Sequence, residues 1–156
     1  MFEEKNIWKG NPEGITLLYW SLKGITTLLV LMLVFHFFFL KKIGLSLASE
    51  LSIFGVIFFL YVLYKWLVRK SYSYGISNEH VKFQGGILTN VITNIPYNKI
   101  TDVAIYQTLF QRILGIYDLA IQTAGSFDAE VIFYGIKKPD LPKNLILERV
   151  RKSERK

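Results

Sequence analysis

Two apolar stretches decide how this chain folds: residues 24–40, GITTLLVLMLVFHFFFL, and residues 51–68, LSIFGVIFFLYVLYKWLV. A helix needs about 20 apolar residues to cross the roughly 30 Å hydrocarbon core of a bilayer. Leu17, Leu18 and Trp20 extend the first stretch backward past Lys23, whose long stem can carry its charge to the headgroups. The sequence therefore predicts a transmembrane helical hairpin over residues 15–70, with spans at about 20–40 and 51–68 and a connection over residues 41–50.

The distribution of Lys and Arg predicts the orientation of this hairpin, because cytoplasmic flanks carry an excess of these residues. The connection holds Lys41 and Lys42, whereas the side with both chain ends holds six such residues: Lys5, Lys9, Lys23, Lys65, Arg69 and Lys70. We therefore expect a plasma (inner) membrane protein with two spans, whose amino-terminal segment (1–14) and carboxyl terminus are both cytoplasmic. Aromatic residues at the same ends of the spans are typical of a bilayer interface: Tyr19, Trp20, Tyr61, Tyr64 and Trp66.

An alternative is that the first apolar run is a cleaved signal peptide, with Ser46 and Ala48 imitating a cleavage site. The long charged amino-terminal region and the lysines directly after the run argue against it. His36 and Glu50 lie near the outer boundary of the spans, where we expect them to be simple interfacial residues. No charge pair is expected inside the membrane.

Composition excludes several classes of function. The chain has 156 residues, a net charge of +7, 51% hydrophobic residues and no cysteine, which rules out disulfides and thiolate chemistry. Residues 71–136 hold three basic and five acidic side chains, so the folded middle lacks the basic stripe that nucleic-acid binding needs. We expect no nucleic-acid partner, no metal and no cofactor.

After Lys70 the pattern changes from continuously apolar to alternating, which favours short β-strands. Strands are expected at 71–76, 80–84, 87–95, 100–107, 119–123 and 131–136, with Gly85 and Gly86 supplying positive φ angles for a tight turn. A final helix over about 140–152, capped by Asp140, carries an apolar stripe that should plug the open end of a barrel: Leu141, Leu145, Ile146 and Val150. The predicted fold class is membrane α+β: a transmembrane hairpin, then an antiparallel β-barrel or sandwich (71–152) closed by this amphipathic helix, then a basic tail (153–156).

The order of six or so strands and one helix resembles a pleckstrin-homology (PH) domain, and over nearly its whole length the chain resembles the YdbS-like bacterial PH-domain membrane proteins. The residues that carry the resemblance are Trp8, Gly10, Pro12, Tyr74, Gly75, Ile76, Gly85, Ile95, Pro96, Ile100, Asp102, Val103, Arg112, Leu114, Gly115, Ile116, Thr123, Ala124, Gly125, Gly135 and Ile136. The resemblance implies a fold and a location, and it suggests a partner of the same kind, a membrane protein with PH-like domains.

Few residues suit catalysis. His36 belongs to a span and His80 to a strand, so they cannot meet, and no nucleophile elbow, P-loop or zinc-protease motif occurs. The remaining carboxylates are expected to be solvated: Asp102, Asp118, Asp128 and Glu130. Arg112 is expected to pair with Asp102 or to cap a helical turn near Gly115, a structural or interaction turn, in preference to binding a ligand. The protein is therefore predicted not to be an enzyme.

The basic residues predict contact with lipid. The first β-hairpin offers Lys82 alone, beside Glu79, which is too little for a phosphoinositide pocket. Six other residues are candidates for contact with anionic lipid: Lys65, Arg69, Lys70, Arg149, Arg151 and Lys152. The leading interpretation is a membrane-anchored module that binds a protein partner or the membrane surface. The alternatives are an envelope defence factor against membrane-active peptides or bacteriocins and, ranked last, a membrane enzyme or transporter.

Overall fold

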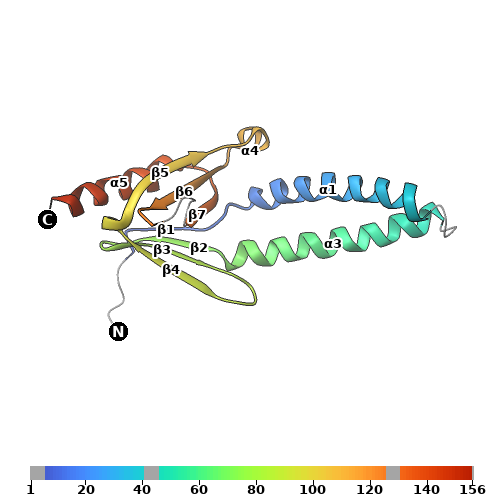
Figure 1. The fold of residues 1–156 in the computed structure, drawn as a ribbon, viewed down its shortest axis with the longest axis horizontal. Coiled ribbons are helices and arrows are strands. Elements are labelled where there is room, and N and C mark those ends of the chain that lie inside the picture. Colours follow the sequence, from blue (N-terminus) through green and yellow to red (C-terminus); the bar gives the residue numbers. More distant parts are fainter. Residues whose placement is uncertain (1–5, 41–45, 126–130, 156) are drawn as a thin grey trace.

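The structure, a computed structural model, describes residues 6–40, 46–125 and 131–155. A two-helix hairpin projects from one end of a β-rich domain (Figure 1). The elements in chain order are β1 (Trp8–Gly10), α1 (Ile15–Phe35), the π-helical turn η1 (His36–Leu40), α3 (Leu47–Ser71), β2 (Ser73–Ile76), β3 (His80–Gly85), β4 (Val91–Pro96), the 3₁₀ turn η2 (Tyr97–Lys99), β5 (Ile100–Tyr106), α4 (Leu109–Leu114), β6 (Tyr117–Thr123), β7 (Val131–Ile136) and α5 (Asp140–Glu154).

The two helices of the hairpin are long and apolar enough to cross a membrane, over Ile15–Phe38 and Ala48–Ser71. A core helix of a water-soluble domain would be mostly buried, but only 11% and 6% of their most apolar windows are buried. Side chains such as Leu33 and Phe59 are 70% and 66% exposed. The predicted pair of spans is therefore present as two candidate membrane-spanning helices, and the second begins at Leu47 rather than at residue 51.

Close contact between α1 and α3 depends on Gly24. A Cβ atom at this position would lie 2.2 Å from the ring of Tyr61, so the absence of a side chain lets the ring pack against the helix. The Tyr61 hydroxyl donates to the carbonyl oxygen of Trp20 at 3.0 Å. At the other end of the hairpin, the Ser46 side chain accepts from the backbone N–H of Ser49 and caps α3.

Within the described residues, seven strands form two antiparallel sheets, ordered β1-β2-β3-β4 and β5-β6-β7. The sheets remain separate, so the domain is a sandwich and the predicted barrel closure is not found. Apolar side chains from both sheets meet in one core, in which the rings of Tyr74 and Phe133 stack at 4.5 Å. Helix α5 covers this core with Ile146, which is fully buried.

Strand β1 gives the amino-terminal segment a structure that its sequence did not predict. Trp8 pairs with Ile76 and Gly10 with Tyr74, and the Trp8 ring stacks on Phe133 at 6.2 Å. The helical hairpin therefore lies between two adjacent strands of one sheet, as the connection from β1 to β2. Both of its ends are held by the same β domain.

The order of the predicted strands is confirmed, but several boundaries and turns differ. The third predicted strand begins at Val91 rather than at Ile87, because residues 86–90 form the connection from β3 to β4. Of the two glycines predicted to form the tight turn, Gly86 alone has a positive φ, at 114°, since Gly85 still belongs to β3.

The last helix also differs in detail from its prediction. Pro139 occupies the N-cap position of α5 and no side chain caps the helix, so the predicted cap by Asp140 is wrong. Leu141 is 53% exposed and lies outside the stripe, whereas Leu145, Leu147 and Val150 pack against the same core as Ile146. Lys41, Lys42, Asp128 and Glu130 lie outside the described residues.

Candidate functional site

Three connections of the β domain gather at the end that joins the helices, called the junction end here. Strands alternate in direction within an antiparallel sheet, so the β1–β2 and β3–β4 connections leave from the same end. In the second sheet the β5–β6 connection contains α4, which packs against α1. Figure 1 shows α4 and the β3–β4 connection reaching the level at which the helical hairpin begins.

Lysines and aromatic rings alternate on the hairpin next to this end. The ammonium nitrogen of Lys65 lies 5.3 Å from the ring centre of Trp20 and 5.7 Å from that of Tyr61. Lys23 lies over Tyr19 at 5.5 Å, and Lys70 over Trp66 at 4.0 Å. Such cation–π pairs let a lysine stem lie along apolar surface while its charge stays near water or lipid phosphate.

Arg69 has a different role from its lysine neighbours. Its Nη1 donates to the carbonyl oxygen of Pro12 at 3.2 Å, which ties the end of α3 to the segment between β1 and α1. Its Nε is buried and has no hydrogen-bond partner among the described residues. This side chain therefore holds the helical hairpin on the domain. Because of these contacts, only part of the Arg69 guanidinium group is free to contact lipid.

The six predicted lipid-contact residues fall into two separate groups. Lys65, Arg69 and Lys70 lie at the junction end, whereas Arg149, Arg151 and Lys152 lie on α5, whose carboxyl end points away from the hairpin (Figure 1). Helix α5 has 15 residues and is therefore about 22 Å long, well beyond the roughly 8 Å over which salt screens charges. Lys152 also pairs with Glu148 at 2.5 Å, and this hydrogen bond and charge lower the pKa of the Glu148 carboxyl. Only the first group lies on one of the two candidate membrane-spanning helices.

Helix α4 exposes its apolar residues and buries a polar one. Thr108 and Gln111 form a reciprocal capping box at its start, and Gly115 ends it with a left-handed φ of 64°. Gln111 is 1% exposed, whereas Leu109 and Ile113 are 73% and 74% exposed. This is the reverse of the arrangement that water favours.

Arg112 lies in the last turn of α4, where its carbonyl oxygen accepts from the N–H of Gly115 at 3.3 Å. No ion pair joins Arg112 to Asp102 in the described structure, and the Asp102 carboxylate instead accepts from the backbone N–H of Val103 at 2.7 Å. Asp118, predicted to be a solvated carboxylate, accepts from Gln111 Nε2 and from the N–H of Gly135, each at 2.8 Å. Asp118 therefore joins α4 to β6 and β7, and no local sequence signal marked it.

The β3–β4 connection is a second apolar projection. Leu88 is fully exposed and Ile87 is 39% exposed. Val91 and Ile92, whose side chains leave opposite faces of β4, are 49% and 51% exposed. The tip of the β3–β4 hairpin therefore extends beyond the core that covers the rest of the first sheet.

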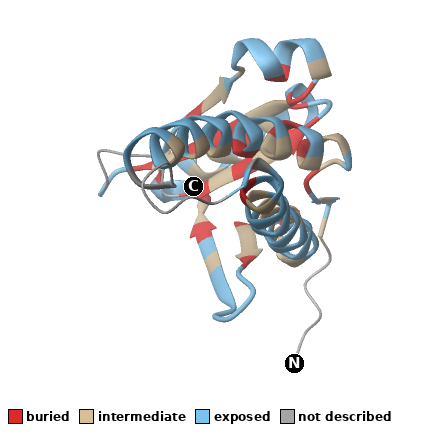
Figure 2. Ribbon diagram, turned by 90° about the vertical axis from the view of Figure 1, so that its right-hand side faces the viewer, coloured by how far each residue is buried: buried red, intermediate tan, exposed pale blue. Residues whose placement is uncertain are grey.

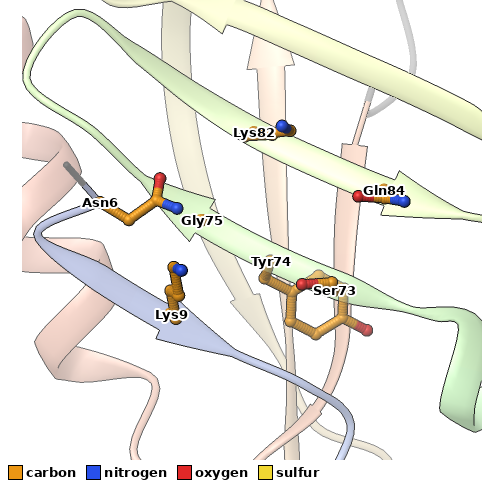
Figure 3. A pocket seen from close by; sticks show the side chains of 7 residues that line it. All are labelled: Asn6, Lys9, Ser73, Tyr74, Gly75, Lys82 and Gln84. Carbon is orange, nitrogen blue, oxygen red and sulfur yellow. The ribbon is translucent and has the colours of Figure 1, made fainter. Parts of the chain in front are cut away.

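A shallow depression of about 200 Å³ lies on the outer face of the first sheet (Figure 3). Lys9, Gly75 and Lys82 occupy opposed positions on three adjacent strands, and the missing side chain of Gly75 leaves the space between the two lysines. The other lining residues are Asn6, Ser73, Tyr74 and Gln84. The sequence predicted Lys82 as the one lysine in this region, and Lys9 was missed because strand β1 was not predicted. Two ammonium groups and polar side chains suit a small anion or an acidic side chain.

His36 and Glu50 form a pair at the outer end of the hairpin. Nδ1 of His36 lies 2.9 Å from a carboxylate oxygen of Glu50, which is 1% exposed. Both were expected to be simple interfacial residues, and the structure adds a contact between them. The two residues come from different helices, so the contact depends on how the helices pack.

The fold agrees with what comparison with known proteins finds. Comparisons with the curated proteins and with the solved structures give no match. A family model described as "Bacterial PH domain" matches residues 24–152, which is most of the chain. By this match, and with two antiparallel sheets covered by a carboxyl-terminal helix, the chain belongs to the bacterial PH domain family.

Proposed function

We propose that this protein is an integral membrane protein of the YdbS-like kind, in which a helical hairpin holds a non-enzymatic PH domain at the cytoplasmic face of the plasma membrane. The domain serves as a binding module, for a membrane protein partner or for the membrane surface. One observation carries the proposal: a hairpin with apolar side chains exposed on all sides is inserted between β1 and β2 of the domain.

Exposure of the hairpin supports its place in a bilayer. Large apolar side chains are exposed along both helices, from Leu18 to Phe38 and from Leu51 to Leu67, and water penalises such a surface by roughly 25 cal/mol per Å². The lysine–aromatic pairs next to the domain have the chemistry of a membrane interface. Together with the excess of Lys and Arg on this side, they favour a cytoplasmic domain.

A binding role suits the surface of the domain better than catalysis does. His36 belongs to the hairpin and His80 to β3, and the depression between Lys9 and Lys82 is open and shallow. Strands β1 and β4 are the edges of the first sheet, and an edge strand can accept a strand from a partner.

The absence of cysteine from the chain allows a direct test. We expect the protein to stay with vesicles in alkaline carbonate. In intact cells, an impermeant maleimide should label Ala48→Cys, at the outer end of α3, and should label Ser153→Cys only after the inner membrane is opened. Release by carbonate would disprove the anchor, and labelling of Ser153→Cys in intact cells would disprove the orientation.

A further inference from the structure

We propose that two apolar projections of the domain insert into the membrane interface on either side of the hairpin. The first is the β3–β4 tip, formed by Ile87, Leu88, Val91 and Ile92, and the second is the outer face of α4, formed by Leu109, Phe110 and Ile113. This proposal rests on the proposed function, because the hairpin determines where the bilayer lies. It adds that the PH domain itself inserts these two projections into the lipid.

The composition of α4 points to an apolar environment outside the domain. Its one buried residue, Gln111, is held by Asp118 and by the capping box, so the helix cannot rotate to hide its apolar face. Leu109, Phe110 and Ile113 are 73%, 53% and 74% exposed. A short helix fixed in this orientation presents its apolar face to something that is not water.

The position of α4 identifies its level relative to the hairpin. The Thr108 hydroxyl, at the start of α4, lies 3.4 Å from the hydroxyl of Tyr19 on α1. The neighbours of Tyr19 on α1 include Leu18, which is 50% exposed, and Leu22, which is 38% exposed. Along the axis of the helical hairpin, the apolar face of α4 therefore lies at the same position as the beginning of the apolar surface of α1.

The β3–β4 tip is apolar and uncharged. No charged residue occurs from Phe83 to Asn98, although exposed hairpins and edge strands are commonly protected from association by charge. Leu88 is fully exposed at the turn. Gln84 pairs with Ser73, so residues 85–88 run on past the start of β2 and alongside the end of α3 (Figure 1).

The arrangement of the two projections around the hairpin selects lipid as the occupant. Figure 2 views the molecule from the end at which the helical hairpin lies, with α4 at the top and the β3–β4 tip at the bottom, both exposed. In Figure 1 the helical hairpin lies between these two projections in the vertical direction. A single protein partner would have to reach around the hairpin to cover both. A bilayer surrounds the hairpin on all sides at this level. Lys23, Lys65 and Lys70 place cationic groups there for its phosphates.

Site-specific fluorescence on the full chain in lipid nanodiscs of phosphatidylcholine and phosphatidylglycerol tests this proposal. Single cysteines replace Leu88 and Ile113 and carry an environment-sensitive dye, and lipids spin-labelled at a shallow depth act as quenchers. Val30→Cys on α1 reports whether the hairpin is in the bilayer, and Arg151→Cys on α5 is the water-exposed control. All four side chains are exposed, so the substitutions leave the core intact, which circular dichroism checks.

We expect the shallow quencher to reduce fluorescence at positions 88 and 113 by roughly twofold, as for groups 5–10 Å inside the headgroup boundary, and to leave position 151 unchanged. Position 30 should respond to a deep quencher. If position 30 responds while 88 and 113 do not, the insertion is wrong and the anchor stands. If position 30 does not respond, the proposed function itself fails. A blue-shifted dye at 88 or 113 that lipid cannot quench would mean that protein covers it, which also overturns the proposal.

Discussion

Replacing Gly135 with alanine should loosen the hairpin from the domain, because this residue lies where β7 meets the start of α1. Its carbonyl oxygen accepts from the N–H of Glu13 at 3.0 Å and from the Thr16 hydroxyl at 3.4 Å, and its N–H donates to Asp118. A Cβ atom would lie 1.9 Å from Thr16 Oγ1 and 2.7 Å from Thr16 Cγ2. Thr16 is 1% exposed, so it has little room to move away.

Gly115 provides a matched control for the size of this effect. Its φ is 64° and that of Gly135 is 65°, but a Cβ atom at Gly115 would meet nothing within 4 Å. Alanine at either position bears the cost of the left-handed conformation, about 1 kcal/mol. Gly135→Ala adds the cost of overpacking, about 1–3 kcal/mol. We therefore expect Gly115→Ala to cost about 1 kcal/mol and Gly135→Ala about 2–4 kcal/mol.

Thermal unfolding of the full chain in mild detergent measures the difference, since each kcal/mol lowers the melting temperature by roughly 4–8 °C in a domain of this size. Thr16→Ala removes the two closest atoms, so the double substitution should lose less than the two single losses added together. Equal losses from Gly115→Ala and Gly135→Ala, or simple additivity with Thr16→Ala, would refute a tight contact between Thr16 and Gly135.

Three further predictions test the other contacts. Asp118→Asn keeps one acceptor for Gln111 or Gly135 and loses the other, so it should lower stability by about 1–3 kcal/mol in the same melting experiment; an unchanged melting temperature would contradict its bridging role. Burial raises the pKa of the Tyr74 hydroxyl, so the folded domain keeps a proton that the unfolded chain releases near pH 10. The contribution of this retained proton to the free energy of unfolding is therefore fully present below about pH 10 and is lost as the pH rises further. Tyr74→Phe should flatten this alkaline loss in denaturation followed from pH 8 to 12, and an equally steep loss would contradict the assignment. Gly24→Val should push the Tyr61 ring away and separate α1 from α3, measured as a longer distance between spin labels on the two helices, whereas Gly55→Val, with nothing within 4 Å, should leave that distance unchanged.

The hairpin and most strands could be predicted because their signals are local. The apolar runs need only the composition of about 20 consecutive residues, and the strands after Lys70 follow from a period of two. Strand β1 has no such signal, because it contains three residues and its partner lies beyond the whole hairpin. The family resemblance included Trp8 and Gly10 without assigning them a strand.

The candidate site was less predictable because its contacts join distant parts of the chain. Lys9 and Lys82 flank one depression only because β1 and β3 both pair with β2. Asp118 was expected to be solvated and no local signal marked Gln111, yet their hydrogen bond is what turns the apolar face of α4 outward. Basic residues on α5 were grouped with those of α3 by charge alone, whereas the direction of α5 separates them.

Attachment of the hairpin at both ends determines which surfaces remain for a partner. Pro12 and Arg69 join the two ends of the hairpin through one hydrogen bond, and Gly135 holds the start of α1 through two more. A domain attached in this way cannot turn freely about a single linker, so the hairpin sets its orientation. In the arrangement that we propose, the junction end is directed at lipid, and a cytoplasmic partner would meet the outer face of the first sheet, with Lys9 and Lys82, and the basic end of α5. Both surfaces are cationic, so we expect the segment that binds there to be acidic.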